Sequence, residues 1–427
     1  MTMPRVVAEH SGGDAATRPA EPSPAEAPAN SRPVRVLIVD TAIAFGGTLA
    51  VARNLLKHLD GNLVDASLVS ACSDGFVSDG FAGKADIRLL APPVSYVRLQ
   101  KWKLAIHRRF RWGPLRRTVE LAAMATELLA NMSYVIRLAR MCRRKHVDVV
   151  HANNFALEPL WAARLLGIAM VSHLHGFLYL PMERSRRRNF RHVNAFVSIS
   201  RAVTESAVQA GVERSRIREI PNFVERVPDD SPPPMPAELA IGIFGRVTHW
   251  KGQKEFLRAA MQVLPKFPGL RVYIVGDASD SDATYFDECR QFALTSPFAA
   301  QFEFTGLVTD VAAHYRKCYV VVHASIEPEP FGMVLIEAMA EARPVVASIL
   351  GAPSEIIQDG VEGYLVDPQD SQTMARRIMT LLADPALATR MGREGHKKAL
   401  THYDPRIAAR RFERLYTEIA HVTPQRT

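Results

Sequence analysis

The chain has 427 residues, of which 48% are hydrophobic and 23% charged, and this globular composition excludes a chain that is disordered throughout. Its four cysteines form no C-x-x-C pair and no close Cys/His group, which argues against a zinc-finger site and for a reducing compartment. The net charge of +9 is uneven, because residues 1–225 carry 31 Lys+Arg against 19 Asp+Glu, and residues 226–427 carry 22 against 25. The basic character therefore belongs to the first half of the chain.

The amino-terminal segment, residues 1–33, is rich in Ala, Pro, Glu and Ser and contains no apolar stretch typical of a signal peptide. We expect it to be a disordered tail. The best candidate for a membrane span, Val119–Cys142, is interrupted by charged residues. It leaves at most nine uncharged residues in a row, fewer than the roughly 20 that cross a bilayer. The sequence therefore predicts a cytoplasmic protein without a membrane span.

Strand-like apolar runs alternate with helix-like stretches over residues 34–225. The first run, Val34–Asp40, is apolar almost throughout, as expected of a strand buried on both faces of a parallel sheet. A Gly46-Gly47 pair and a helix to about Leu59 follow it. Further strands are expected at Ala66–Ser70, Val147–His151, Ala169–His173 and Ala195–Ser200, and a long helix at Leu121–Lys145. This alternation predicts a Rossmann-like, doubly wound α/β domain over residues 34–225.

The alternation restarts after residues 226–238, which form a linker by their content of Pro, Asp and Ser. Strands are expected at Leu239–Phe244, Leu270–Val275, Phe302–Thr305, Tyr319–His323 and Pro344–Ser348, with helices from about Gln253 and Phe331. We assign residues 239–400 to a second Rossmann-like domain and residues 401–427 to a helical tail. Because ligands bind at the carboxyl ends of parallel strands, we expect the two sheets to face each other across a ligand-binding cleft.

The segment Glu327–Ala340 (EPEPFGMVLIEAMA) combines a nearly all-apolar helix with two informative acidic side chains. Glu337 lies in the middle of the helix, where a buried carboxylate needs a hydrogen-bond partner that vicinal sugar hydroxyls would supply. Glu329 lies eight positions earlier, just before the helix begins, where free N–H groups and the helix dipole suit phosphate or a developing negative charge. The alternative is a structural ion pair beside an ordinary acidic residue at a helix start.

A second candidate site, Phe244–Gly252 (FGRVTHWKG), begins where the first strand of the second domain ends. Arg246 and Lys251 bring two cations to this loop, and the planar guanidinium suits bidentate contact with phosphate. Their place at the carboxyl end of a strand favours a diphosphate clamp over two solvated surface cations. We expect both residues at a loop edge rather than in a core, so that replacing them changes stability little.

In the first domain, Gly46-Gly47 and His175 follow strands and should therefore lie at the same edge of the sheet. Glycines there let the backbone approach a ligand closely. The spacing lacks G-x-G-x-x-G and the acidic residue expected about 20 positions later, which disfavours a dinucleotide-dependent oxidoreductase. His175 is a candidate site residue, with His173 as a rival and a structural role as the alternative.

Together these motifs resemble those of the family 4 glycosyltransferases, which are retaining, nucleotide-sugar-dependent enzymes with the GT-B fold. The resemblance covers about Val34 to Leu400. It rests on the E-x7-E pair in its setting EPFGMVLIEAMA, on GRVTHWKG, on the triplets VGD and FTG, and on GAPSEII followed by DGVEGYLV. It implies two facing Rossmann-like domains and a hexosyltransferase, which we place in cell-surface polysaccharide or glycolipid synthesis.

The resemblance assigns a role to each of the four charged candidates. Arg246 and Lys251 would bind the donor diphosphate and neutralise its charge as the leaving group departs. Glu337 would hold the ribose hydroxyls, and Glu329 would lie near the transferred sugar.

The resemblance likewise implies roles for apolar and glycine positions. The backbone of Phe331 and Gly332 would contact the sugar hydroxyls, and the donor base would lie near Gly306 and Leu307. Gly46-Gly47 would lie against the phosphates or the acceptor, with His175 near the sugar and the acceptor. The segment after the glycine pair, TLAVARN, lacks the acidic residue that is common there in the family.

Breaking an anomeric C–O bond leaves an anionic nucleoside diphosphate, so the reaction needs a positive environment more than a strong base. Arg246, Lys251 and a helix start supply it, and we expect no metal and no cofactor besides a UDP- or GDP-sugar co-substrate. The triplet Asp280-Ser281-Asp282 resembles the D-x-D metal site of the other major transferase fold, but it lies in a polar loop and we expect it to be solvated. Because no well-placed nucleophile is evident, we expect departure and attack on the same face of the sugar.

Three alternatives to a transferase remain open at this point. A sugar-nucleotide epimerase of the same two-lobed fold would convert a donor without an acceptor. A non-catalytic sugar-nucleotide-binding protein would not need the four charged residues together. Nucleic-acid binding would suit the basic half, but no recognised motif supports it.

The positive charge of the first half is concentrated in residues 93–145, which hold 13 Lys+Arg against two acidic residues. Within it, residues 98–117 (RLQKWKLAIHRRFRWGPLRR) interleave aromatic and aliphatic side chains with cations, as segments at a membrane interface do. The alternative is a solvated helix face. We predict a peripheral association with the anionic inner face of the cytoplasmic membrane, and the family resemblance implies a lipid-linked saccharide as a possible acceptor.

Overall fold

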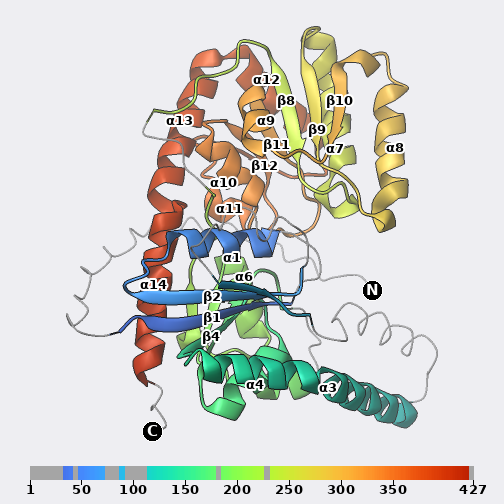
Figure 1. Ribbon diagram of the computed structural model, residues 1–427. Coiled ribbons are helices and arrows are strands. Elements are labelled where there is room, and N and C mark those ends of the chain that lie inside the picture. The colour runs from blue at the N-terminus through green and yellow to red at the C-terminus, as the bar shows by residue number, and fades with distance from the viewer. Residues whose placement is uncertain are drawn as a thin grey trace. The chain divides into compact units, whose positions relative to one another are not determined.

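The computed structural model describes residues 32–41, 47–72, 86–91, 113–178, 184–225 and 231–422. These residues form two parallel β-sheets, each with helices packed on both faces (Figure 1). The predicted pair of Rossmann-like α/β domains is therefore confirmed. Gly46 and residues 98–112 of the predicted membrane segment lie outside the described residues.

The first sheet has seven parallel strands in the order β3-β2-β1-β4-β5-β6-β7. The strands are β1 (Val34–Asp40), β2 (Val64–Ser70), β3 (Asp86–Leu89), β4 (Val149–Ala152), β5 (Ala169–Leu174), β6 (Ala195–Ser198) and β7 (Ile217–Glu219). The helices of this half are α1 (Gly47–His58), α3 (Gly113–Arg144), α4 (Leu157–Leu166), α5 (Arg184–Phe190) and α6 (Arg201–Gln209).

Strand β1 is apolar throughout its centre because both faces of the sheet are covered. Val36 and Ile38 pack in one cluster with α1, whereas Leu37 and Val39 pack in another with α3 and α4. Successive side chains of a strand point to opposite faces, so burial on both faces requires an uninterrupted apolar run.

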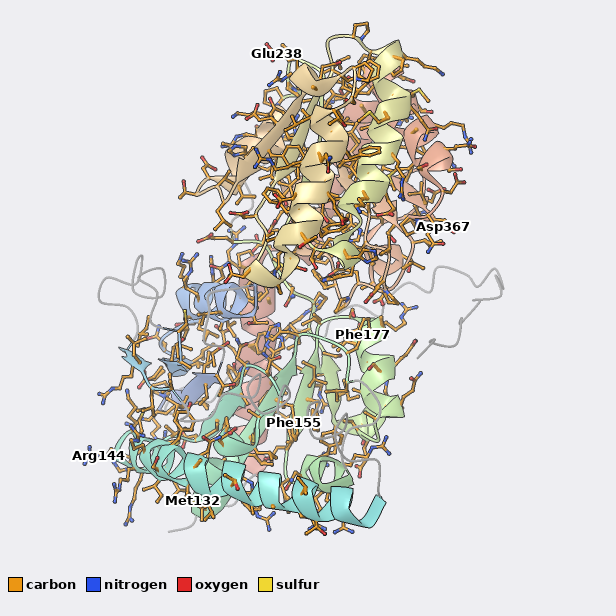
Figure 2. All side chains as sticks on the ribbon, turned by 90° about the vertical axis from the view of Figure 1, so that its right-hand side faces the viewer. Met132, Arg144, Phe155, Phe177, Glu238 and Asp367 are labelled. Carbon is orange, nitrogen blue, oxygen red and sulfur yellow. The ribbon has the colours of Figure 1, made fainter. Side chains whose placement is uncertain are left out.

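The second sheet has six parallel strands in the order β10-β9-β8-β11-β12-β13. The strands are β8 (Ala240–Phe244), β9 (Arg271–Val275), β10 (Phe302–Gly306), β11 (Val320–His323), β12 (Val345–Ser348) and β13 (Gly363–Val366). The helices are α7 (Gln253–Val263), α8 (Ala283–Leu294), α9 (Val311–Lys317), α10 (Met333–Ala340), α11 (Pro353–Ile356), α12 (Ser371–Ala383) and α13 (Pro385–His402). In Figure 2, Glu238 marks the end of this domain where β8 begins, and Asp367 follows the end of β13.

The last helix, α14 (Pro405–Val422), packs against the first sheet although it ends the described chain (Figure 1). Phe412 and Tyr416 are completely buried, in the same cluster as Ile38 of β1 and Leu49 of α1. The hydroxyl group of Tyr416 also lies 2.5 Å from Nδ1 of His151, the third residue of β4. Residues 405–422 are thus helical, as the sequence predicts, and α14 forms part of the first domain's core rather than a tail.

The linker before β8 is held by a buried arginine of the second domain. Arg343 is completely buried, and its guanidinium donates hydrogen bonds to the carbonyl oxygens of Pro233 (3.1 Å), Pro234 (2.5 Å) and Glu341 (2.7 Å). Burial lowers the pKa of Arg343 to about 10, which leaves the side chain charged at neutral pH. The predicted linker therefore contains a segment fixed to the second domain.

The strands missed by the sequence analysis share a place in the sheets. β3, β7 and β13 each form an edge, and the first two are short and carry charged residues (DIRL and IRE). β3 and β7 therefore lack the apolar run that identifies a central strand, whereas β13 (GYLV) is apolar but only four residues long. None of the described helices is long and apolar enough to cross a membrane.

Replacing Phe412 with alanine tests whether α14 is part of the first domain's core. Deleting a completely buried aromatic ring leaves a cavity, so the free energy of unfolding should fall by about 3–5 kcal/mol. Denaturant unfolding followed by far-UV circular dichroism measures the change. Arg410→Ala, on the exposed side of α14, serves as the control and should change stability by less than about 0.5 kcal/mol. Equal stability of the two variants would contradict the packing.

Candidate functional site

Two loops at the carboxyl edge of the second sheet are tightly joined. Gly252, which ends the loop after β8, has a φ of 72°, and a Cβ atom there would lie 1.9 Å from the carbonyl oxygen of Ala324. Ile326, in the loop after β11, donates its N–H to the carbonyl oxygen of Trp250 (2.9 Å). Only glycine permits this approach, and the approach brings the neighbouring Lys251 to the second loop.

Lys251 and Glu329 form an ion pair between these loops. Nζ of Lys251 lies 2.6 Å from Oε2 of Glu329, and the two side chains are only 18% and 9% exposed. The expectation that Lys251 lies at a loop edge is therefore wrong, because its side chain is mostly buried and its ammonium group is paired.

The two oxygens of the Glu329 carboxylate differ in their surroundings. Oε2 also accepts a hydrogen bond from the hydroxyl group of Ser325 (3.0 Å) and lies 3.3 Å from Nε2 of His323. Oε1 accepts no hydrogen bond from the described residues. The carboxylate is thus anchored through one oxygen, and the other is left for a ligand.

The environment of Glu329 keeps it ionised. Burial alone would raise the pKa of this carboxyl group, but the hydrogen bond with His323 and the charge of Lys251 outweigh burial and lower the pKa to about 2. At neutral pH Glu329 is therefore an acceptor of hydrogen bonds and cannot donate a proton.

The backbone of Glu329 is fixed by the loop after β12. Its N–H donates to the carbonyl oxygen of Leu350 (3.1 Å), and its carbonyl oxygen accepts from the N–H of Ala352 (2.9 Å). Gly351, between them, has a φ of 84°, and a Cβ atom there would lie 2.5 Å from the carbonyl oxygen of Glu329. Both the side chain and the main chain of Glu329 are thus held in place.

Glu337 lies in helix α10 and is partly buried, as expected. Its hydrogen-bond partner within the protein is the hydroxyl group of Tyr315 in α9, which donates to Oε2 at 2.8 Å. Burial raises the pKa of Glu337, and the hydrogen bond from Tyr315 opposes that effect. The ring of Tyr315 stacks on Phe244 at the end of β8, with 4.0 Å between the ring centroids. One oxygen of Glu337 therefore remains for a further partner.

Arg246 is exposed in the loop after β8, as predicted, and its guanidinium makes no hydrogen bond or ion pair with any described residue. Hydrogen bonds from Ser279 and Thr248 lower the pKa of Asp282, and the positive charge of Arg246 lowers it further. These bonds tie Asp282 of the D-x-D triplet to its own loop through Ser279 and to the loop after β8 through Thr248. Among the described residues, no group of His, Cys, Asp or Glu side chains is arranged to hold a metal ion.

The remaining predicted positions of this domain lie near strand ends. Phe331 is buried and packs edge-on against Tyr403, and Gly332 caps the start of α10 with a φ of 107°.

Gly306, the last residue of β10, accepts a hydrogen bond from the N–H of Gly276 (3.1 Å). Leu307 follows and is 84% exposed. A large apolar side chain so exposed at the carboxyl edge is available to a ligand.

In the first domain, His175 follows β5, and Phe177 marks this loop in Figure 2. Nε2 of His175 lies 2.8 Å from Oδ1 of Asn153, which follows β4. The rival, His173, is buried under His175, with 3.9 Å between the ring centroids. His173 is 2% exposed and His175 partly exposed, so His175 is the better placed of the two to meet a ligand.

Gly47 begins α1, and the carbonyl oxygen of the next residue, Thr48, accepts a hydrogen bond from Asn153 (3.0 Å).

Sequence reasoning missed four residues that hold the predicted ones in place. They are His323, Ser325, Tyr315 and Asn153. His323 ends β11 and Ser325 follows it, six and four positions before Glu329. Their polar side chains at the end of a strand, close to Glu329 in the chain, could have predicted the contact. Tyr315 and Asn153 come from other elements, and only the fold brings them to Glu337 and His175.

Two family models match this chain. The one described as glycosyltransferase family 4 matches residues 45–226, and the one described as glycosyl transferases group 1 matches residues 233–398. The matches fall on the two sheet-containing halves and together cover most of the chain.

Similar proteins are known among curated sequences and solved structures. LpcC, a lipopolysaccharide core biosynthesis mannosyltransferase from Rhizobium leguminosarum bv. viciae, is 32% identical over 177 residues, which are 42% of this chain and 49% of LpcC. LpsE, a lipopolysaccharide core biosynthesis glycosyltransferase from Rhizobium meliloti, is 25% identical over 303 residues, covering 66% of this chain and 81% of LpsE. The chain thus spans about half the length of LpcC. The crystal structure of Anabaena HepE in complex with UDP has a TM-score of 0.71 at 20% identity, covering 90% of this chain and 100% of that one.

Replacing Lys251 with methionine tests the buried ion pair. Removing one partner leaves a buried, unpaired carboxylate, so the free energy of unfolding at pH 7 should fall by about 3–5 kcal/mol. Denaturant unfolding gives this value. Arg246→Met is the matched control and should change stability by less than about 0.5 kcal/mol, since Arg246 is exposed and unpaired with the described residues.

The pH dependence of the same variant gives a second readout. The folded-state pKa of Glu329 lies near 2, below its ordinary value of 4.5, so its contribution to stability is complete above pH 4.5 and is lost as the pH falls toward 2. Without Lys251 the folded-state pKa rises toward 4.5, and this contribution shrinks. The stability difference between parent and Lys251→Met should therefore narrow below pH 4.5. A difference independent of pH would contradict the pairing.

Proposed function

Because the chain is a family 4-like glycosyltransferase with the GT-B fold, we propose that it transfers a hexose from a nucleotide sugar to an acceptor hydroxyl with retention of configuration. The observation that carries the proposal is the ionised Glu329, which is anchored through Oε2 beside Lys251 and keeps Oε1 for a ligand. The names of relatives support the substrate class: LpcC is a mannosyltransferase, and structures of HepE contain UDP, UDP with glucose, or UDP-glucose.

The cations of the loop after β8 suit a diphosphate. Arg246 presents an exposed guanidinium, which binds two phosphate oxygens at once. Lys251 lies five positions later in the chain and is paired with Glu329. In this proposal its ammonium group lies between the diphosphate and the carboxylate. The two cations stabilise the negative charge that develops on the leaving group as the anomeric C–O bond breaks, and no metal is required for this step.

The low pKa of Glu329 limits what it can do. An ionised carboxylate accepts hydrogen bonds from sugar hydroxyls and stabilises positive charge on the anomeric carbon, but it does not protonate a leaving group. The three donors at Oε2 withdraw charge from the carboxylate and make Oε1 a weaker nucleophile, so in this proposal Oε1 positions the sugar and does not attack it. This favours departure and attack on the same face.

Other contacts complete the donor site in this proposal. Glu337 binds the ribose hydroxyls with the oxygen that Tyr315 does not occupy. The backbone at Phe331 and Gly332 contacts the sugar, and the base lies near Gly306 and the exposed Leu307. The expectation that Gly46-Gly47 and His175 lie near the acceptor belongs to the same proposal. The acceptor is a saccharide, lipid-linked in cell-surface polysaccharide or glycolipid synthesis, as the names of the Rhizobium relatives suggest.

The alternatives differ from this proposal in what they require of an acceptor. A sugar-nucleotide epimerase would convert a donor alone, and a binding protein would convert nothing. Product analysis with and without a saccharide acceptor separates the three.

Two substitutions separate donor binding from turnover. Glu337→Gln removes a charge-assisted hydrogen bond to ribose, so affinity for the free nucleoside diphosphate should fall about 10- to 100-fold. Glu329→Gln should leave that affinity near the parent's and lower release of nucleoside diphosphate from the donor about 100-fold, because its partner is the reacting sugar. Calorimetric titration with UDP and GDP, and turnover of UDP- and GDP-hexoses, give the two values.

A matched control is Glu303→Gln, which removes a half-exposed carboxylate on β10 that pairs with Arg271. It should change neither affinity nor turnover. Binding of the nucleoside diphosphate by Glu337→Gln as tightly as by the parent would overturn the ribose assignment.

The basic segment 98–117 gives a prediction for the membrane. Because each cation near an anionic surface contributes about 1 kcal/mol, the chain should sediment with anionic liposomes at low salt and be released at high salt. Replacing five cations of the segment with glutamine should abolish sedimentation and spare nucleotide binding. Those residues are Arg108, Arg109, Arg111, Arg116 and Arg117.

The control for this experiment removes the same charge from exposed positions of the second domain. The replaced residues are Lys317, Arg376, Arg390, Arg393 and Lys397. This control should still sediment. Equal binding to neutral and anionic liposomes, or none to either, would refute a peripheral association through residues 98–117.

A further inference from the structure

The orientation of the Asn153 side chain is determined by its neighbours. Its Nδ2 atom donates a hydrogen bond to the carbonyl oxygen of Thr48 (3.0 Å) and another to Oδ2 of Asp40. A backbone carbonyl oxygen can only accept, so the atom that faces it must be the amide nitrogen. The opposite atom, which faces His175, is therefore the amide oxygen Oδ1.

This orientation determines where His175 carries its hydrogen. Oδ1 of Asn153 can only accept, and it lies 2.8 Å from Nε2 of His175, so Nε2 must be the N–H donor. A neutral imidazole has one N–H group, which leaves the lone pair on Nδ1. Burial lowers the pKa of His175 to about 3, so the ring is neutral at physiological pH.

The Nδ1 atom of His175 is buried and has no hydrogen-bond partner in the described structure. An acceptor atom in such a place is costly unless a ligand supplies the missing donor. Among the described residues, His173 packs against this ring, and it too has a buried nitrogen without a partner, Nε2, so the two rings do not satisfy each other.

We propose that Asn153 is a positioning residue that holds His175 in the Nε2–H form, so that Nδ1 accepts a hydrogen bond from a saccharide hydroxyl group. The identity of this ligand rests on the proposed function, whereas the hydrogen-bonded form of His175 does not. Asp40 and Thr48 anchor Asn153 in turn, and they come from the end of β1 and the first turn of α1. The network thus ties His175 to the turn that follows Gly47.

Nitrogen-15 NMR of the full chain, labelled at histidine and without ligand, tests the proposal. The His175 signals are identified as those lost in His175→Gln. In the parent, Nε2 should be the protonated nitrogen at pH 7. Asn153→Ala removes the acceptor, so both neutral forms should become populated.

A matched control is Asn194→Ala, which removes a side chain that accepts from the N–H of Met170 in the same sheet (2.9 Å). It should leave the His175 signals unchanged. An Nδ1–H form in the parent, or an unchanged His175 spectrum in Asn153→Ala, would overturn the proposal. Because no ligand is present, these results are independent of whether the chain transfers a sugar.

Discussion

The site depends on one buried ion pair, between Lys251 after β8 and Glu329 after β11. A carboxylate that is 9% exposed is stable in its charged form only when opposite charge and hydrogen-bond donors surround it. Lys251, Ser325 and His323 supply these donors, and all three lie at one oxygen. The pair therefore joins two loops and, at the same time, leaves Oε1 of the ionised carboxylate without a hydrogen-bond donor among the described residues.

The fold supplies this geometry through close backbone contacts at the carboxyl edge of the second sheet. Gly252 lets the first loop touch Ala324, and Gly351 lets the loop after β12 lie against the backbone of Glu329. A Cβ atom at either position would overlap a backbone carbonyl oxygen of the facing loop, so the loops would have to move apart. The same principle extends to the first domain, where the end of β1 and the start of α1 hold Asn153 and, through it, His175.

Much of this arrangement is predictable from the sequence. Central strands of parallel sheets are continuous apolar runs, and such runs predict β1 and β8. The charged residues of the candidate site were found because they stand out at strand ends or inside an apolar helix. The edge strand β3 was missed because it lacks an apolar run. Tyr315 and Asn153 were missed because no local pattern tells which distant residue a buried Glu337 or His175 will meet. The packing of α14 on the first sheet was missed for the same reason. The spacing of Phe412 and Tyr416 indicates an amphipathic helix, but it does not indicate which sheet the helix packs against.

We propose that the carboxyl edge of the second sheet binds a nucleotide sugar. This can be measured as the change in melting temperature of the full chain with UDP, GDP and ADP and with the hexose derivatives of each. At least one UDP- or GDP-hexose should raise the melting temperature, as a ligand that binds only the folded state does, and Arg246→Ala should lose most of the shift. No shift with any of these compounds would contradict it.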